Sequence, residues 1–358
     1  METIKVKASR PYSVTVGPEQ LKTIGERARS LFPKAVRVML VSDDTVFPLY
    51  GETVSRSLIA EGFETEPFVF PHGEKSKNSK TYLDLISAIA RAGLSRSDFC
   101  VALGGGVVGD LTGFAAATYM RGIGFIQVPT TLLAMVDASV GGKTAVDLPE
   151  GKNLLGAFWQ PSEVICDTDT LKTLPDPVYA DGCAEIVKYG CMMDKELFET
   201  LEQQDLKSVE EKVISRSVSD KRDIVEQDEC ETGSTRILLN FGHTVGHAVE
   251  KVSNYQISHG SAVSIGMCVM VRAQSECGML GKRTVKRIES LLASFALPTE
   301  TGFSARDLSD AILSDKKKTG KTLNFVALRE IGEAYVMPIP IGEIESFIEK
   351  GLKTCKSN

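Results

Sequence analysis

Three of the chain's four histidines, the side chain most often used to bind transition metals, lie close together in its second half. His243 and His247 are four residues apart, so a helix would place both rings on one face, and this spacing predicts that both bind a metal ion. Asn240 and Arg236 precede His243 by one and two turns and are expected along the same stripe. The alternative is a helix with one buried histidine and two on the surface. His259, the third histidine, and the nearby Arg236 favour the metal site.

A glycine-rich turn, GGGVVGD, follows directly after the apolar run FCVAL. Glycines let the backbone approach a phosphate closely, and a following helix would offer free N–H groups and the positive end of its dipole. The pattern also fits Gly-x-Gly-x-x-Gly, but it follows a middle strand instead of the first strand of the usual dinucleotide motif. The segment therefore predicts an anion or pyrophosphate site, with a tight structural turn as the alternative.

Further polar groups follow the next apolar run. Gly141-Gly142-Lys143 combines a flexible backbone with a compact cation suited to phosphate, and Lys152-Asn153 follows soon after. Thr130-Thr131 stands at an expected helix start, where threonines often serve only as a cap. Earlier in the chain, the loop PHGEKSK could hold a ribose and an anion through Glu74 and Lys77, although by itself it is an ordinary surface loop.

The composition describes a globular protein with room for two domains. The 358 residues are 42% hydrophobic and 25% charged, which excludes a disordered chain. The net charge of −6 argues against nucleic acid or an anionic membrane as a partner, although local cations can still bind an anionic substrate. No apolar stretch is long enough to span a bilayer, and the N-terminus lacks a signal-peptide pattern, so we expect a cytoplasmic protein. The eight cysteines form no Cys-x-x-Cys pair and are expected to be reduced.

The first half alternates short apolar runs with helical patterns, which predicts βαβ units and a mainly parallel sheet. Ligands of such sheets bind beyond the carboxyl ends of the strands, so the loops described above are the expected binding segments. The expected strands are 36–41, 68–70, 99–103 and 124–128, with a helix at 78–92.

Helical patterns dominate after about residue 175, where Asp176-Pro177 is a natural helix start. This change predicts a domain boundary near residue 175, with an α/β domain before it and an all-α or mainly helical domain after it. A short extended pair, at 323–327 and 334–336, interrupts the helices. The expected helices are 177–190, 206–228, 237–252, 260–278, 282–295, 304–313 and 342–353.

Seven segments, in this order, resemble the 3-dehydroquinate synthase family, the NAD-dependent cyclases of the shikimate pathway. They are GGGVVGD, YMRG, VPTTLLAMVDASVGGKTAVD, GKNLLGAFWQP, AEIVKYG, LNFGHTVGHAVE and HGSAVSIGM. The resemblance runs from about Val38 to Gly332 and so covers most of the chain. The architecture of the family is similar to that of glycerol dehydrogenase and the iron-type alcohol dehydrogenases.

The resemblance implies an NAD-binding α/β domain at 1–175, a mainly helical metal- and substrate-binding domain at 176–358, and an active site in the cleft. The implied substrate is the anionic sugar phosphate 3-deoxy-D-arabino-heptulosonate 7-phosphate, and the products are 3-dehydroquinate and phosphate. The implied reaction combines oxidation, phosphate elimination, reduction, ring opening and aldol closure. NAD and Zn²⁺ (or Co²⁺) are the implied cofactors, and a homodimer is expected.

The resemblance also replaces the metal ligands that spacing alone predicts. It implies Glu185, His243 and His259 as the ligands and gives His247 a catalytic role beside the metal. Three protein ligands leave open positions, as a catalytic metal requires. The other catalytic residues that it implies are Asp137, Lys143, Lys188 and Glu231.

Several cations are expected in the site, because the implied substrate carries both a carboxylate and a phosphate. The implied substrate-binding residues are Arg121, Lys152, Asn153, Lys221, Arg236, Asn240 and Lys316, with Lys317 as the alternative to Lys316. The implied NAD-binding residues are Asp43, His72, Gly73, Glu74, Lys77, Gly105, Gly106, Val107, Gly109, Asp110, Thr130, Thr131, Lys143, Lys152, Thr170, Leu171 and Thr173. One departure from the family pattern is that the run from Glu231 to Arg236 is one residue longer than usual.

Three alternatives stay open at this point. A metal-dependent polyol or alcohol dehydrogenase would release NADH, whereas a cyclase uses NAD catalytically and liberates phosphate. Another sugar-phosphate cyclase would act on a substrate without the carboxylate, which the cations around Arg236 and Lys316 disfavour. A catalytically inactive regulator that binds NAD and metal is disfavoured by the intact set of metal and catalytic residues.

Overall fold

The structure, a computed structural model, describes residues 1–233, 235–315 and 321–352. Its backbone contacts divide the chain into two compact units. The first comprises Met1–Pro175 and Glu210–Cys230, and the second comprises Asp176–Val209 and Glu231–Asn358. A single division at residue 175 is therefore incomplete, because residues 210–230 return to the first unit. Lys316, an expected substrate-binding residue, and its alternative Lys317 lie outside the described residues.

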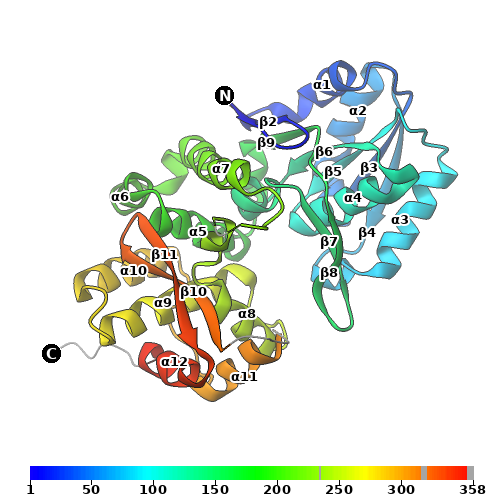
Figure 1. The fold of residues 1–358 in the computed structure, drawn as a ribbon. Helices are drawn as coiled ribbons and strands as arrows, with labels where there is room; N and C mark the ends of the chain where they lie inside the picture. Colours follow the sequence, from blue (N-terminus) through cyan, green and yellow to red (C-terminus); the bar gives the residue numbers. More distant parts are fainter. Residues whose placement is uncertain (234, 316–320, 353–358) are drawn as a thin grey trace. The chain divides into compact units, whose positions relative to one another are not determined.

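A seven-stranded sheet forms the centre of the first unit, with strand order β1-β2-β9-β6-β5-β3-β4 (Figure 1). All neighbouring strands are parallel except β1 and β2, which are antiparallel. The mainly parallel sheet expected from the sequence is thus present, with β1, β2 and β9 added to the expected strands. The strands are β1 (Glu2–Val6), β2 (Tyr12–Gly17), β3 (Arg37–Asp43), β4 (Glu64–Phe70), β5 (Phe99–Gly104), β6 (Gly124–Pro129) and β9 (Glu163–Asp167).

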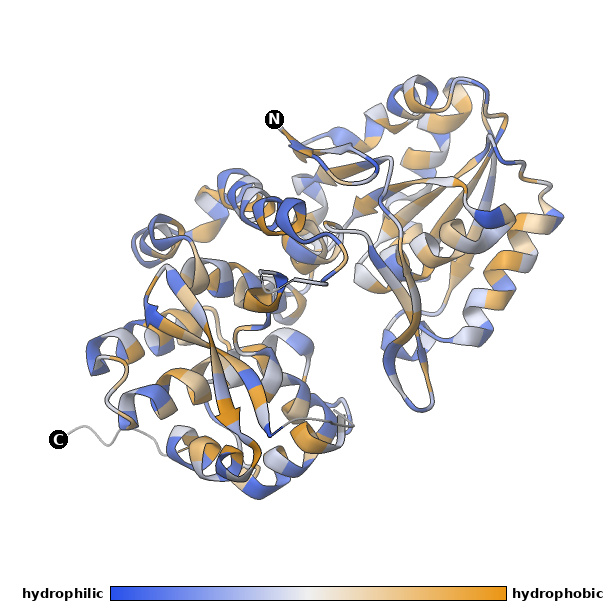
Figure 2. Ribbon diagram, viewed as in Figure 1, coloured by the Kyte–Doolittle hydropathy of each residue, from blue (hydrophilic) through white to orange (hydrophobic). Residues whose placement is uncertain are grey.

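Helices cover both faces of this sheet, because successive side chains of its central strands point to opposite sides. On one face Val38 of β3 packs in a cluster with Leu58 of α2, and on the other Met39 packs in a cluster with Leu85 of α3. Figure 2 shows apolar residues along the central strands. The helices of the first unit are α1 (Ile24–Leu31), α2 (Glu52–Ala60), α3 (Ser79–Arg91), α4 (Gly106–Thr118) and α7 (Glu210–Gln227).

Short helical turns and a hairpin complete the first unit. The hairpin pairs β7 (Lys143–Leu148) with β8 (Gly151–Phe158), and β7 packs against α4. The short turns are η1 (Gln20–Thr23), η2 (Phe47–Gly51), η3 (Glu74–Ser76), η4 (Tyr119–Arg121), η5 (Ala134–Ala138) and η6 (Thr168–Thr173).

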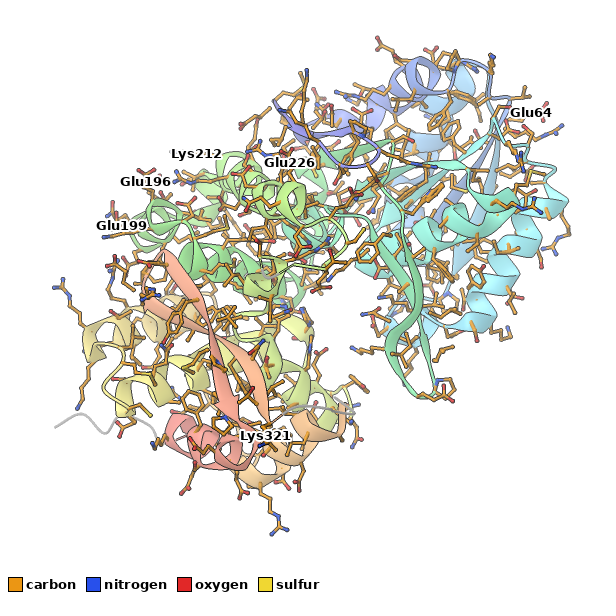
Figure 3. The ribbon with its side chains drawn as sticks, in the orientation of Figure 1. Glu64, Glu196, Glu199, Lys212, Glu226 and Lys321 are labelled. Carbon is orange, nitrogen blue, oxygen red and sulfur yellow. The ribbon has the colours of Figure 1, made fainter. Side chains whose placement is uncertain are left out.

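Helix α7 belongs to the first unit because it packs on β1, β2 and η5. Glu226, labelled in Figure 3, lies near its end and accepts a hydrogen bond from the backbone N–H of Lys7 at 2.7 Å. Glu229 follows and accepts hydrogen bonds from the backbone N–H and the hydroxyl of Ser9, each at 2.7 Å, and from Nε2 of Gln160 at 2.8 Å. The sequence predicts the helix but not this long-range attachment.

The second unit is mainly helical, as expected, and it contains a β10–β11 hairpin. The helix expected at 237–252 is wrong as a single element, because Gly242 adopts a left-handed conformation (φ 77°) between η8 and α8. The helices are α5 (Asp176–Met192), α6 (Lys195–Gln203), α8 (His243–Val252), α9 (His259–Glu276), α10 (Lys282–Ser294), α11 (Ala305–Asp315) and α12 (Ile344–Leu352). The remaining elements are β10 (Thr322–Glu330), β11 (Glu333–Pro340), η7 (Leu206–Ser208), η8 (Arg236–Asn240) and η9 (Ile341–Glu343). Among the described residues, none of the helices combines the length and the apolar character that crossing a bilayer requires.

Candidate active-site residues in the two units

Three side chains of the second unit form a group that could hold a metal ion: Glu185 on α5, His243 on α8 and His259 on α9. Nε2 of His243 lies 3.5 Å from Oε1 of Glu185, and Nε2 of His259 lies 3.6 Å from the same oxygen. Glu185 is 1% exposed and His243 is 12% exposed. One carboxylate oxygen and two ring nitrogens therefore converge on one small region of a largely buried site.

Glycines let the three helices come close enough to bring these ligands together. A Cβ on Gly260, next to His259, would lie 2.3 Å from Cα of Asp181 on α5. A Cβ on Gly266 would lie 2.0 Å from the backbone oxygen of Gly242, at the start of α8. Because both close neighbours are backbone atoms, any side chain here would push α9 away from the helices that carry the other ligands.

The hydrogen bond of the second ring nitrogen suits His243 to metal binding. Nδ1 lies 3.1 Å from the backbone oxygen of Phe241, so it carries the proton and leaves the lone pair of Nε2 facing Glu185. Burial, which outweighs the attraction of Glu185, lowers the pKa of His243 to about 3, and Lys188 acts in the same direction. The ring is therefore neutral at pH 7, which is the form that binds a metal.

His259 lies between two carboxylates, with Nε2 facing Glu185 and Nδ1 lying 3.5 Å from Oε2 of Glu250. Burial favours the neutral ring, but the contacts with Glu185 and Glu250 outweigh it and raise the pKa of His259 to about 10. The site thus attracts positive charge. A divalent cation can replace the proton on Nε2, so the donor set fits a metal ion.

The structure does not support the expectation that His243 and His247 share a metal. Their ring centroids are 5.5 Å apart, and among the described residues no ligand group contains both. His247 instead forms a second possible group with Glu250 and His259. Glu250 was not among the residues expected from the sequence, although its position seven residues after His243 places it on the same face of the helix.

The polar stripe expected from Arg236 through Asn240 to the histidines is also wrong. Arg236 and Asn240 lie on the separate 3₁₀ helix η8, and the left-handed Gly242 turns the chain before α8 begins. Arg236 is 1% exposed. Lys188, one turn after Glu185 on α5, forms a buried ion pair with Oε2 of Glu185.

The glycine-rich turn of the first unit joins β5 to α4, as expected for an anion-binding loop. A Cβ on Gly105 would lie 3.1 Å from the side chain of Thr131, and one on Gly109 would lie 2.7 Å from Gln127. Neither these two glycines nor Gly104 and Gly106 have positive φ angles. Gly105 and Gly109 are therefore needed because β6 and the loop after it come close to the backbone, and not because the backbone adopts a left-handed conformation.

The loops around this turn supply polar groups. The N–H of Thr130 donates to the backbone oxygen of Gly104 at 3.0 Å, and the buried Thr130 hydroxyl has no hydrogen-bond partner within the described chain. Thr131 Oγ1 accepts from the N–H of Ala134 at 3.2 Å, so it does cap the next turn. Gly106, Val107 and Asp110 form the first turns of α4.

Lys77 is the centre of a charged network that joins expected cofactor and substrate residues. Its Nζ lies 2.5 Å from Oδ2 of Asp110 and donates to Oδ1 of Asn153 at 2.6 Å. The backbone N–H of Asn153 donates to Asp147 at 2.8 Å, which holds Asn153 in a left-handed conformation. Burial disfavours the Lys77 ammonium, but attraction to Asp110 and Glu74 outweighs it and raises the pKa of Lys77.

Lys152 and Glu74 complete this network with an ion pair at 3.6 Å. A second ion pair joins Lys221 of α7 to Asp137 of η5, with Nζ 3.0 Å from Oδ1 and 2.6 Å from the backbone oxygen. Lys143 begins β7 and is exposed, after two glycines with positive φ. The hydroxyl of Tyr12 accepts a hydrogen bond from Gly141 at 3.1 Å and supports this turn.

The other expected cofactor residues lie after β3, β4 and β9. Oδ1 of Asp43 accepts from Thr45 and Val46, so this oxygen stabilises its own turn. His72 is exposed and contacts Asp44, with Gly73 in a positive-φ conformation. The hydroxyl of Thr173 lies 2.5 Å from that of Tyr50, and Thr170 and Leu171 are buried in η6. Arg121 and Glu231 are exposed, and both have positive φ angles.

Comparison with known proteins places the chain in a family. Residues 67–181 match the family model for the 3-dehydroquinate synthase N-terminal region, and residues 182–318 match that for the 3-dehydroquinate synthase C-terminal region. The 3-dehydroquinate synthase of Enterococcus faecalis is 44% identical over 345 residues, which are 95% of this chain and 96% of the relative.

Two solved structures have the same fold. The 2-epi-5-epi-valiolone synthase of Streptomyces hygroscopicus, solved with NAD⁺ and Zn²⁺, has a TM-score of 0.86 at 28% identity, with 98% of each chain covered. A 2-deoxy-scyllo-inosose synthase has a TM-score of 0.87 at 24% identity, with 98% of this chain and 100% of that chain covered. The two family-model matches and the 44% identity to the Enterococcus faecalis enzyme show that the chain belongs to the 3-dehydroquinate synthase family of lyases.

Proposed function

We propose that the chain converts 3-deoxy-D-arabino-heptulosonate 7-phosphate to 3-dehydroquinate and phosphate, with NAD and a divalent metal ion, Zn²⁺ or Co²⁺, as cofactors. One observation carries the proposal. This chain belongs to the family, and it brings Glu185, His243 and His259 close enough together to bind a single ion. When bound, NAD accepts and returns a hydride, and the metal ion acts as a Lewis acid on the substrate hydroxyls.

The first unit is proposed to hold NAD. The N-terminus of α4 after the glycine turn suits a pyrophosphate, because its N–H groups are not capped by any described side chain. The buried hydroxyl of Thr130 is a further polar group at this loop. Glu74 and Asp110 supply carboxylates for ribose hydroxyls, and Lys77 fixes the position of Asp110.

Arginine, lysine and amide side chains are proposed to bind the two anionic groups of the substrate. The guanidinium of Arg236 can bind a carboxylate or phosphate through two parallel hydrogen bonds, and Asn240 follows it one turn later. Lys152 and Asn153 are proposed as phosphate-binding groups in the first unit, where Lys77 and Asp147 hold Asn153 in place. Arg121, Lys221 and Lys316 are further candidates.

Five polar residues are proposed to handle protons and hydroxyls. Lys188 holds Oε2 of Glu185, so Oε1 is the oxygen that faces the two rings. Asp137, held by Lys221, is suited to accept a hydrogen bond from a substrate hydroxyl. His247 is an exposed imidazole beside the other histidines, where it is proposed to transfer a proton. Lys143 and Glu231 keep the catalytic roles that the family pattern suggests.

We also propose that the chain forms a homodimer through the β7–β8 hairpin. Leu154 and Phe158 are 60% and 43% exposed, and their spacing places both on one face of β8. Leu155, on the opposite face, is 37% exposed, and exposed apolar side chains along a hairpin favour association with a second copy. Light scattering should therefore report a dimer, and Leu154→Glu should yield monomer; a wild-type monomer would reject the proposal.

The reaction is tested by mixing purified protein with NAD, Zn²⁺ and the heptulosonate phosphate. Inorganic phosphate should be released without accumulation of NADH, and a chelator should stop the release. NADH in amounts equal to the substrate consumed would instead indicate a polyol dehydrogenase. Release of phosphate from a heptulose phosphate that lacks the carboxylate, at an equal rate, would indicate another sugar-phosphate cyclase.

A further inference from the structure

We propose that Glu250 is a positioning residue that fixes the ring of His259 for metal binding, an inference that rests on the metal site of the proposed function. Oε2 of Glu250 lies 3.5 Å from Nδ1 of His259, while Nε2 of the same ring faces Glu185. An imidazole whose Nδ1–H donates a hydrogen bond to a carboxylate directs the lone pair of Nε2 to the metal and becomes a stronger ligand.

The burial of Glu250 indicates a specific role. Its side chain is 4% exposed, and a buried carboxylate is costly unless a charge or hydrogen-bond donor compensates it. Its position on α8, two turns after His243, lets one helix supply a ligand at its start and a partner for another ligand near its end. The charge of Glu250 is therefore directed at the site and not at solvent.

The backbone around Glu250 is also held firmly. Its carbonyl accepts hydrogen bonds from the N–H of Tyr255 at 2.7 Å and from Oγ of Ser253 at 2.8 Å. Asn254 and Tyr255 both adopt left-handed conformations, which turn the chain back towards α9 and His259. The short connection between α8 and α9 thus fixes the distance between Glu250 and the ring that it contacts.

Asp181 holds the backbone of His259 from the other side. Its Oδ1 accepts hydrogen bonds from the hydroxyl of Ser258 at 2.6 Å and from the N–H of Ser261 at 3.1 Å, so it caps the start of α9. His259 is the first residue of that helix. Asp181 therefore sets where the backbone lies, and Glu250 sets how the ring is turned.

The alternative role for Glu250 is direct ligation together with His247. The two nitrogens of the His259 ring point in different directions. A single ion therefore cannot be bound both by the set Glu185, His243 and His259 and by the set His247, Glu250 and His259. The group with Glu185 is favoured because Glu185 and His243 are largely buried, whereas His247 is exposed. Direct ligation by Glu250 would give a second, separate metal equivalent.

The test measures metal affinity directly, by competition of the purified apoprotein with a chromophoric chelator for Zn²⁺. Wild type should bind one equivalent. Glu250→Gln, which keeps the shape and loses the charge, should bind about 10-fold more weakly, and Glu250→Ala about 100-fold more weakly. With Co²⁺, the visible absorption bands of Glu250→Gln should shift, because the ligand field of the ring has changed.

The matched control is Glu289→Gln, which removes another partly buried ion pair of the second unit. Its partner Arg272 lies 13 residues after His259 on α9, about 20 Å along the helix. This variant should lose stability and keep wild-type Zn²⁺ affinity and Co²⁺ bands.

Wild-type Zn²⁺ affinity in both Glu250 variants would overturn the inference, as would a second equivalent in wild type that disappears in Glu250→Ala. Phosphate release is measured on the same preparations. If the wild type binds one ion tightly but releases no phosphate, the proposed function is rejected and the role of Glu250 is not. If the wild type releases phosphate and both Glu250 variants keep its Zn²⁺ affinity, the role of Glu250 is rejected and the proposed function is not.

Discussion

The two units treat their buried charges differently. In the first unit, the chain itself supplies opposite charges at close range, as in Lys77 with Asp110 at 2.5 Å and Lys221 with Asp137 at 3.0 Å. The two members of such a pair hold each other in place before any ligand binds. The first unit is therefore expected to reach its final structure without NAD.

In the second unit, two carboxylates face one imidazole. Glu185 and Glu250 both face His259, and Lys188 pairs with Glu185. Although burial opposes it, these carboxylates raise the pKa of His259 to about 10, so this region favours positive charge. The contrast teaches that the second unit gathers side chains suited to a cation, whereas the charged pairs of the first unit hold each other in place.

The largest effect should come from removing a ligand of the second unit. His259→Ala should weaken Zn²⁺ binding by more than about 100-fold, because removing a metal ligand should reduce the affinity more than removing Glu250, which only positions that ligand. NAD binding by the first unit should stay at the wild-type level. Chelator competition and NAD fluorescence titration measure the two affinities, and full metal occupancy in the variant would contradict the ligand role.

The corresponding change in the first unit is Lys77→Met. Loss of the cation leaves Asp110 without its buried partner, so the free energy of unfolding should fall by about 3 kcal/mol at pH 7. Because the pKa of Lys77 is raised, its stabilisation is present below the unfolded value of 10.5 and is lost as the pH rises through the folded value. Urea denaturation measures both effects.

Lys80→Met is the control for this variant. Lys80 lies three residues after Lys77 and forms an ion pair with Asp84 on α3. The side chain of Lys80 is 87% exposed, so its loss should lower the free energy of unfolding by no more than about 1 kcal/mol. Zn²⁺ affinity should be unchanged in both variants. Equal destabilisation by the two substitutions would contradict the importance of burial.

A smaller pair of effects compares one glycine from each unit. Gly260→Ala places a methyl group against the backbone of Asp181 and should cost about 1–3 kcal/mol, with weaker Zn²⁺ binding. Gly105→Ala meets only the side chain of Thr131, at 3.1 Å, and should cost less while weakening NAD binding. Hydrogen exchange should localise each loss to its own unit; a loss shared by both units would contradict their independence.

The sequence predicts the family and the fold class correctly, because seven ordered segments and the change from βαβ to helical patterns are local features. The sequence does not predict features that depend on contacts between residues far apart in the chain. Nothing within residues 210–230 indicates that α7 joins the first unit, since that depends on Lys7 and Ser9. Nor does helical periodicity reveal that Gly242 interrupts the expected helix.

The candidate site shows the same limit. Spacing on one helix predicts that His243 and His247 act together, yet the group containing His243 draws its other members from two different helices. Glu185 enters through its resemblance to a family motif, because helix packing cannot be read from periodicity. Glu250 was missed for the same reason: its partner His259 lies on the next helix, beyond a turn with two left-handed residues.

The smallest predicted change in the free energy of unfolding concerns Asp98 of the first unit. It tests whether backbone N–H groups stabilise a buried charge there, as oppositely charged side chains do elsewhere in this unit. Asp98 is 3% exposed, and its carboxylate accepts hydrogen bonds from the N–H groups of Val36, Arg37 and Ser95 at 2.6–2.9 Å. Although burial opposes it, the hydrogen bonds from Arg37 and Ser95 lower the pKa of Asp98. Asp98→Asn turns an amide N–H₂ towards these donors and should cost about 1 kcal/mol at pH 7.

The dependence on pH separates this charge from the metal-dependent ones. Because the folded pKa of Asp98 is lowered, its stabilisation is present above the unfolded value of 3.8 and is lost as the pH falls through the folded value. The difference between wild type and Asp98→Asn should therefore shrink on acidification, and it should be the same with and without chelator. Urea denaturation between pH 7 and pH 3 measures it, and a difference that vanishes when metal is removed would show that the first unit also depends on the ion.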